Sequence, residues 1–379
     1  MNFENNVLNK NIYELKEVKN ILINRIKEHE EYFESEYLKN KVIKTIMMSG
    51  NHNYESRYGN VEGTFTLNEL EKANEKDSEL MVRYLEYRYK FKNYPTNHIV
   101  NEFPIVLAIE PSKACNLKCI MCFQSNNDFK IETGSNGIMT MDIYEKIMEE
   151  AEKYKLPAIV LASRGEPLLN PNIDKMIKRA SQARIIDIKM NTNALLLDEN
   201  MSRILLSTEL NSLVFSVDAI NESDYKKIRG GDFNKVIKNI ERFNEIRRNE
   251  FPNSKLRTRT AVVLVNSVKS EESIEEVKSF WKDKVDELSM KTENDFKGVY
   301  DEKHITEKNP CSLLWERLYV WHNGVMNPCD IDYKSKLTCG EISEISIKDA
   351  WKSEYMETLR EKHISKIRDV FPCNNCTGY

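Results

Sequence analysis

The sequence lacks an excess of charge of either sign. Its 379 residues include 56 Lys and Arg against 60 Asp and Glu, a formal net charge of −4. A nucleic-acid-binding protein needs a basic surface to neutralise phosphates, so we expect no nucleic-acid partner. Disorder along the whole chain is also excluded, because 40% of the residues are hydrophobic and 9% are aromatic, which is enough to build a core.

Long apolar runs are missing as well. The longest ones, residues 158–162 and 261–265, have the length of a β-strand, whereas a membrane span needs about 20 apolar residues. Residues 1–20 contain no apolar segment of the kind found in signal peptides. We therefore expect a cytoplasmic protein without a membrane partner. Because one domain typically has about 100–200 residues, we also expect more than one structural unit.

Residues 1–100 have a helical pattern. Apolar residues recur at helical spacing in 12–26 and 38–46, and Thr66 and Glu69 form a capping-box pattern. From Phe103 onward, short apolar runs alternate with helical stretches. These runs predict six buried parallel strands, at 105–109, 158–162, 185–190, 213–217, 260–265 and 288–290.

Three polar residues mark the expected starts of helices between these strands: Thr140, Asn170 and Ser270. Strands and helices that alternate in this way predict βα units in a doubly wound sheet or in a complete or partial barrel. In such barrels, the chemistry gathers in the loops at the carboxyl ends of the strands. Residues that directly follow a predicted strand are therefore the first candidates for a functional site.

Cysteine is absent from residues 1–114 and then occurs in two groups. The first group, Cys115, Cys119 and Cys122, follows the first predicted strand. In a cytoplasmic protein, such thiols more often bind metal or act in catalysis than form disulfides. Three thiolates can bind three irons of a 4Fe-4S cube and leave the fourth iron open for chemistry. The alternatives are a zinc site and three unrelated thiols. Zinc prefers four ligands, and no nearby His or fourth Cys completes the set.

The Cys-x3-Cys-x2-Cys spacing after the first strand resembles that of the radical SAM superfamily. This resemblance implies that S-adenosylmethionine (SAM) chelates the open iron and is reductively cleaved to a 5′-deoxyadenosyl radical. It also implies a flavodoxin- or ferredoxin-type electron donor. For the fold, it implies an α/β protein with a partial (β/α)6 barrel.

The resemblance extends to the expected SAM contacts. Gly165-Glu166-Pro167 resembles the GEP motif of the family, which implies that Gly165 and Glu166 hold the SAM ammonium; a carboxylate suits that cation. Arg164 stands where many relatives have Gly. Two assignments have simple alternatives, packing for Met121 and an exposed helix end for Arg229. The remaining cofactor contacts implied in this way are Met121 at the adenine, Asn191, Asn193, Ser216 and Asp218 at the ribose or carboxylate, and Arg229 at the carboxylate.

The second cysteine group lies near the C-terminus. Four thiolates can saturate an iron-sulfur cluster, and a four-cysteine zinc ribbon is the alternative. The order Cys, Gly-x4-Cys, Cys-x2-Cys resembles the SPASM/twitch extension of radical SAM enzymes with one auxiliary cluster, with a spacing close to the 2-deoxy-scyllo-inosamine dehydrogenase type. The expected units are a helical region at 1–100, the barrel at 101–305 and the SPASM/twitch domain at 306–379. The implied auxiliary ligands are Cys311, Cys329, Cys373 and Cys376.

An auxiliary cluster that accepts an electron suits oxidation. We therefore expect a radical SAM oxidoreductase, a dehydrogenase of a small hydroxylated substrate of the sugar or cyclitol type. Three alternatives remain open: a maturase that modifies a peptide or protein, an epimerase with Cys339 as hydrogen donor, and a non-enzymatic zinc-binding protein. The simpler interpretation of Cys339 is a small buried residue in a strand.

Overall fold

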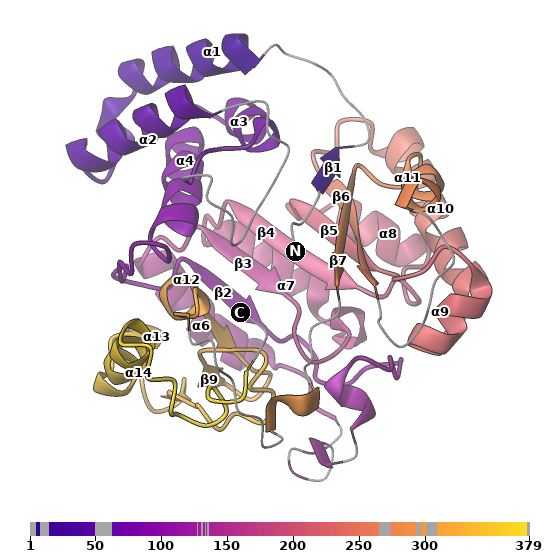
Figure 1. Cartoon of the computed structure of the whole chain (residues 1–379). Coiled ribbons are helices and arrows are strands. Elements are labelled where there is room, and N and C mark those ends of the chain that lie inside the picture. The colour runs from indigo at the N-terminus through magenta and orange to yellow at the C-terminus, as the bar shows by residue number, and fades with distance from the viewer. Residues whose placement is uncertain are drawn as a thin grey trace.

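The structure, a computed structural model of the chain, describes residues 5–7, 15–49, 63–126, 128–129, 132, 134, 136–264, 274–292, 297–300 and 309–376. In chain order, a group of helices is followed by a central sheet and by a smaller C-terminal region, which is drawn in orange to yellow (Figure 1). Within these residues, no helix is long and apolar enough to cross a membrane.

One ten-stranded sheet organises the molecule, in the order β1-β7-β6-β5-β4-β3-β2-β8-β9-β10. Each strand from β2 to β7 pairs in parallel with the next. Among the described residues the sheet is open, because its outermost strands, β1 (Asn5–Val7) and β10 (Gly340–Glu341), pair there with β7 and β9 alone. The predicted partial six-stranded barrel is confirmed. Its strands are β2 (Val106–Ile109), β3 (Ala158–Leu161), β4 (Asp187–Thr192), β5 (Ser212–Ser216), β6 (Arg257–Leu264) and β7 (Glu287–Thr292).

Helices connect the strands and cover the outer face of the sheet. Thr140 caps the first of them as predicted, since its side chain accepts a hydrogen bond from the Ile143 N–H. The prediction of a helix start at Asn170 is wrong: its Oδ1 accepts from the Asn172 N–H at 2.9 Å, and the helix begins after this turn. The predicted start at Ser270 lies outside the described residues. The helices are α6 (Met141–Lys153), α7 (Ile173–Gln182), α8 (Glu199–Leu206), α9 (Glu222–Arg229), α10 (Phe233–Glu250) and α11 (Ile274–Trp281).

Alternation along the strands separates an apolar outer face from a more polar inner face. Leu107, Ile188 and Leu213 belong to the main core beneath the helices. Because successive side chains of a strand point to opposite faces, their neighbours point inward. The inward residues of β4, β5 and β6 include Lys189, Asn191, Ser212, Ser216, Arg257 and Arg259.

The N-terminal helices form a second core against the inner face of the sheet. Apolar residues of these helices pack with Ile105, Val106, Ala158 and Ile186, at the N-terminal ends of β2, β3 and β4. The helices therefore cover the end of the barrel opposite the carboxyl ends of the strands. They are α1 (Leu15–Glu28), α2 (Glu36–Met48), α3 (Leu67–Asn74) and α4 (Ser78–Asn93).

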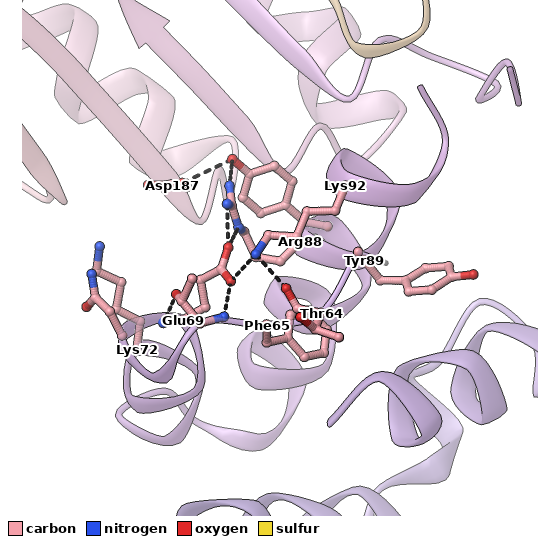
Figure 2. A network of polar contacts seen from close by, with 12 residues as sticks. Thr64, Phe65, Glu69, Lys72, Arg88, Tyr89, Lys92 and Asp187 are labelled. Atoms are coloured by element: carbon pink, nitrogen blue, oxygen red, sulfur yellow. Dashed lines mark hydrogen bonds and ion pairs between the residues drawn. The ribbon is translucent and has the colours of Figure 1, made fainter. Parts of the chain in front are cut away.

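A network of charges joins two of these helices, α3 and α4 (Figure 2). The predicted capping box of Thr66 and Glu69 is confirmed at the start of α3. The buried Glu69 carboxylate accepts from Arg88 Nε and from Lys92 Nζ of α4, each at 2.6 Å. The Tyr87 hydroxyl of α4 donates to Asp187 of β4 at 3.2 Å. This network joins α3 to α4, and Tyr87 joins α4 to the barrel.

The C-terminal region continues the barrel sheet. Strand β8 (Arg317–Val320) pairs in parallel with β2, and β9 (Val325–Asn327) follows it antiparallel. The sequence pattern did not predict β8. The prediction that Cys339 lies within a strand is one residue off, because β10 begins at Gly340. The boundary between 305 and 306 lies outside the described residues and stays a prediction. The helices of this region are α12 (Leu313–Glu316), α13 (Ile347–Trp351) and α14 (Glu354–Ile364).

Candidate cluster and SAM sites

The first cysteine group lies on the loop after β2, at the carboxyl end of the barrel. Within the loop, the Cys122 N–H donates to the Cys119 carbonyl at 3.0 Å. The Ile120 N–H donates to the carbonyl of Ile228 in α9 at 2.9 Å. Burial raises the pKa of the Cys115 thiol to about 11 and that of the Cys122 thiol to about 12. Iron ligation reverses this preference for the protonated thiol, because the ligand is the thiolate and metal binding releases the proton.

Arg229 lies beside the thiol of Cys119. Its Nη1 is 3.7 Å from the Cys119 Sγ. Its Nε donates to the Asp218 carboxylate at 2.7 Å, and both residues are buried. Burial raises the pKa of Cys119, and the guanidinium opposes that rise. In this structure Asp218 and Arg229 bind each other, and the SAM contacts assigned to each of them stay predictions.

Glu166 is a buried carboxylate that accepts hydrogen bonds from uncharged groups. It is 2% exposed. Its donors are the Thr192 hydroxyl at 2.7 Å, the Asn193 N–H at 2.8 Å and the Leu168 N–H at 3.1 Å. Burial raises the pKa of Glu166. A cation placed beside this carboxylate would be strongly favoured, which fits the predicted contact with the SAM ammonium.

Gly165 lets the GEP loop pack on the cysteine loop. A Cβ at this position would lie 2.3 Å from the Ser112 carbonyl oxygen and 2.4 Å from that of Ala114. The next N–H, of Glu166, donates to the Ala114 carbonyl at 2.9 Å. The structure therefore gives Gly165 a packing role that holds Glu166 close to the cysteine loop.

The other predicted SAM contacts lie at the ends of β4 and β5. Asn193 donates from Nδ2 to Asn116 of the cysteine loop at 2.6 Å. Asn191 has a buried Oδ1 without a hydrogen-bond partner. Such an acceptor needs a donor, and a ribose hydroxyl can supply one. Ser216 ends β5, and Met121 is partly exposed in the cysteine loop. These residues fit SAM, but their contacts stay predictions.

The four predicted auxiliary ligands share one pocket. Cys311, Cys329, Cys373 and Cys376 line it together, with other residues of the C-terminal region. Burial raises the pKa of Cys311 to about 12. The four thiols gathered in one pocket fit a fully ligated iron-sulfur cluster.

Cys339 does not line this pocket. Its Sγ donates to the Met326 carbonyl at 3.4 Å, and the side chain packs against the main core. Burial raises its pKa to about 12. These contacts agree with a small residue that fills space beside β9.

Sequence reasoning missed a buried charged group at the ends of β2, β3 and β8. Glu110 is 0% exposed and accepts from Arg164 Nε at 2.6 Å and from Arg164 Nη2 at 2.9 Å. The Nδ1 of His322 lies 2.7 Å from the same carboxylate. Arg164 also donates to the Tyr333 carbonyl at 3.0 Å and lies 4.2 Å from the Trp321 ring centre. The feature of the sequence that could have indicated this group was Arg164, which stands where many relatives have Gly.

Two family models match the chain. Residues 109–278 match the radical SAM superfamily, and residues 311–377 match an iron-sulfur cluster-binding domain, SPASM. The chain therefore contains a radical SAM domain and a SPASM domain. The radical SAM domain implies SAM and a 4Fe-4S cluster, and the SPASM domain implies an auxiliary iron-sulfur site.

Curated relatives of this chain match over part of their length. A GTP 3′,8-cyclase of Clostridium botulinum is 36% identical over 138 residues, which are 36% of this chain and 42% of the relative. A probable GTP 3′,8-cyclase of Methanocaldococcus jannaschii is 33% identical over 137 residues, 36% of this chain and 44% of the relative. The chain therefore spans less than half the length of these relatives.

Solved structures share the fold of this chain. BtrN in complex with AdoMet and 2-DOIA is 18% identical, with a TM-score of 0.50, over 72% of this chain and 92% of that one. Streptococcus suis SuiB bound to S-adenosylmethionine is 19% identical, with a TM-score of 0.52, over 78% and 77%. Native anSMEcpe with bound AdoMet is 17% identical, with a TM-score of 0.54, over 72% and 87%. At these identities, the likeness shows the fold alone.

Proposed function

We propose that this protein is a radical SAM oxidoreductase that dehydrogenates a small hydroxylated substrate of the sugar or cyclitol type. The observation that carries the proposal is the pocket formed by Cys311, Cys329, Cys373 and Cys376. Four thiolates leave no open iron, so this second site suits electron transfer better than binding of SAM or substrate. Oxidation of an alcohol needs an acceptor for its second electron.

The auxiliary pocket lies close to the first cysteine loop. Phe123, next to Cys122, stacks on Tyr333 with ring centres 4.6 Å apart. These two rings share an apolar cluster with Cys329 and Cys376. The two cysteine sites are therefore joined by a few packed side chains, which supports electron transfer between a substrate at the carboxyl ends of the strands and the auxiliary cluster.

When bound, SAM and the first cluster supply a 5′-deoxyadenosyl radical, and the auxiliary cluster supplies a one-electron acceptor. We assign the chain's residues as follows. Cys115, Cys119 and Cys122 hold the first cluster, and Glu166 binds the ammonium group of SAM. Arg229 lies beside the thiol of Cys119 and orients this loop. A flavodoxin- or ferredoxin-type protein is the expected electron donor.

The side chains on the inner face of the barrel favour a polar substrate. Asn191, Val214 and Arg259 lie in one row across β4, β5 and β6. Within the described part of the chain, the buried Nε of Arg259 has no hydrogen-bond partner. This unpaired donor matches the oxygen atoms of a sugar or cyclitol. Arg259 also favours a substrate that carries an anionic group.

A second candidate function is chemistry on a nucleotide. The observation that favours it is the similarity to proteins named GTP 3′,8-cyclase, at 36% identity over 138 residues. This similarity covers 36% of the chain, whereas the auxiliary pocket lies in its last 70 residues or so. We therefore favour dehydrogenation.

Product masses test the proposal. Reconstituted, reduced enzyme is given SAM with sugars, cyclitols, GTP or peptides in separate reactions. Dehydrogenation removes two hydrogen atoms from a sugar or cyclitol and forms 5′-deoxyadenosine. The control is the triple variant Cys115→Ala, Cys119→Ala, Cys122→Ala, which should form neither product. Conversion of GTP or a peptide, with no lighter sugar or cyclitol, would contradict the proposal.

A further inference from the structure

His363 is a buried side chain in the wall of the auxiliary pocket. It lies near the end of α14 and is 1% exposed. Its neighbours in the wall include the four cysteines that we assign as ligands. Nothing in the sequence around His363 distinguishes it from the other five histidines. Its place was decided by the fold, which brings α14 against the loop of Cys311.

One contact determines which nitrogen of His363 carries the proton. The backbone N–H of Cys311 donates to Nδ1 of His363 at 3.1 Å. A backbone N–H can only donate, so Nδ1 must be the unprotonated acceptor. The ring is therefore neutral with its proton on Nε2. This Nε2–H is buried and has no hydrogen-bond partner among the residues that the structure describes.

A second donor in the same wall also lacks a partner. Among the residues that the structure describes, the buried Nε of Arg368 has no hydrogen-bond partner, and Arg368 lines the pocket. The carboxylate in the wall, Asp332, already accepts from the Tyr300 hydroxyl at 2.6 Å and from the Leu337 N–H at 2.7 Å. Buried donors are rarely left unpaired. Two residues of the wall therefore carry N–H groups that need an acceptor, and the sulfur atoms of an iron-sulfur cluster are acceptors.

We propose that the Nε2–H of His363 donates a hydrogen bond to a sulfur atom of the auxiliary cluster and raises its reduction potential. This inference rests on the auxiliary cluster of the proposed function. A reduced cluster carries one more negative charge than the oxidised one, so its sulfur atoms accept a hydrogen bond more strongly. Hydrogen bonds to the sulfurs are one of the factors that set cluster potentials. A higher potential makes the cluster a better acceptor for an electron from substrate.

Two substitutions separate this donor from the structural contact to Cys311. His363→Asn retains an acceptor near the position of Nδ1 but removes the donor at Nε2. His363→Gln places an amide N–H near the position of Nε2. Both are made in the triple variant Cys115→Ala, Cys119→Ala, Cys122→Ala, so that the auxiliary cluster is the only one present. The potential is measured by a redox titration followed by electron paramagnetic resonance, and bound iron is counted in each sample.

The expected result is a lower potential in His363→Asn and a smaller change in His363→Gln, with about four irons in both. One hydrogen bond changes an equilibrium constant on the order of tenfold, which is about 59 mV for one electron. Equal potentials in the triple variant and in both His363 variants made from it would overturn the proposal. Equal shifts in His363→Asn and His363→Gln would overturn it as well.

A second measurement uses protein that keeps His363. It tests the proposed hydrogen bond even if a His363 variant loses its cluster. Protein labelled with 15N-histidine is reduced, and pulsed electron paramagnetic resonance is used to detect coupling between the cluster and a histidine nitrogen. Coupling that is present here, and absent when His363 is replaced, supports the hydrogen bond. A reduced auxiliary cluster without any histidine coupling refutes it. If the pocket binds no iron, the auxiliary cluster itself is refuted, and this inference with it.

Discussion

The substitution Glu110→Gln tests the buried charged group between the barrel and the C-terminal region. Glu110 is 0% exposed, and it accepts two hydrogen bonds from Arg164 and one from the His322 N–H. The substitution keeps the size of the side chain but leaves the Arg164 guanidinium buried without a counter-charge. Breaking a buried ion pair in this way costs about 3–5 kcal/mol of the free energy of unfolding.

The pKa of Glu110 leads to a similar value for the free energy that this buried pair contributes to stability. Burial alone would raise the pKa of Glu110, but Arg164 and His322 outweigh it and lower the pKa from its usual 4.5 to about 2. This difference corresponds to about 3 kcal/mol. Because the pKa is lower in the folded state, the stabilisation is present above about pH 4.5 and is lost as the pH falls toward 2.

A matched surface pair provides the control. Arg203 and Glu250 have nearly the same geometry, with Nε–Oε2 at 2.7 Å and Nη2–Oε1 at 2.8 Å, but both side chains are more than 40% exposed. Glu250→Gln should cost much less than Glu110→Gln, because ion pairs on the surface contribute little to stability. Unfolding by denaturant, followed by tryptophan fluorescence, gives both free energies, and its repetition at lower pH gives the acid slope.

Two results would refute this reasoning. If Glu110→Gln destabilises the protein no more than Glu250→Gln does, then burial does not strengthen the pair as argued. If the wild type and Glu110→Gln lose stability equally between about pH 4.5 and 2, then Glu110 is not the group that titrates. A double variant, Glu110→Gln with Arg164→Met, should recover part of the loss, because it removes the uncompensated charge.

The remaining predictions concern the cysteine and SAM sites. Any one of Cys115→Ala, Cys119→Ala and Cys122→Ala should abolish 5′-deoxyadenosine formation and leave about half of the iron; product formed by the triple variant would contradict the assignment. Glu166→Gln should weaken SAM binding by about 1.5–3 kcal/mol without loss of iron, as measured by calorimetry, because it removes a charge-assisted contact; unchanged affinity would place the ammonium elsewhere. Cys339→Ala should turn over almost normally; deuterium from heavy water that enters the product carbon, and is lost in this variant, would indicate an epimerase.

The sequence alone determined those features that are local in the chain. Cys115, Cys119 and Cys122 lie within one loop, so their spacing was visible without a fold. The six barrel strands were also predictable, within three residues at each described end, because buried parallel strands are short apolar runs. The capping box at Thr66 and Glu69 is another pattern of near neighbours.

Tertiary structure alone decided the features whose partners are distant in sequence. Arg164 and Glu110 are 54 residues apart, and His322 lies 212 residues from Glu110. No periodicity links such residues, and a charged side chain in the sequence is by default an exposed one. Strand β8 was missed for a related reason, since what makes it part of the barrel is its pairing with β2. The pocket around His363 likewise forms because the fold brings α14 to the four cysteines. The sequence had already indicated that these four cysteines bind an iron-sulfur cluster.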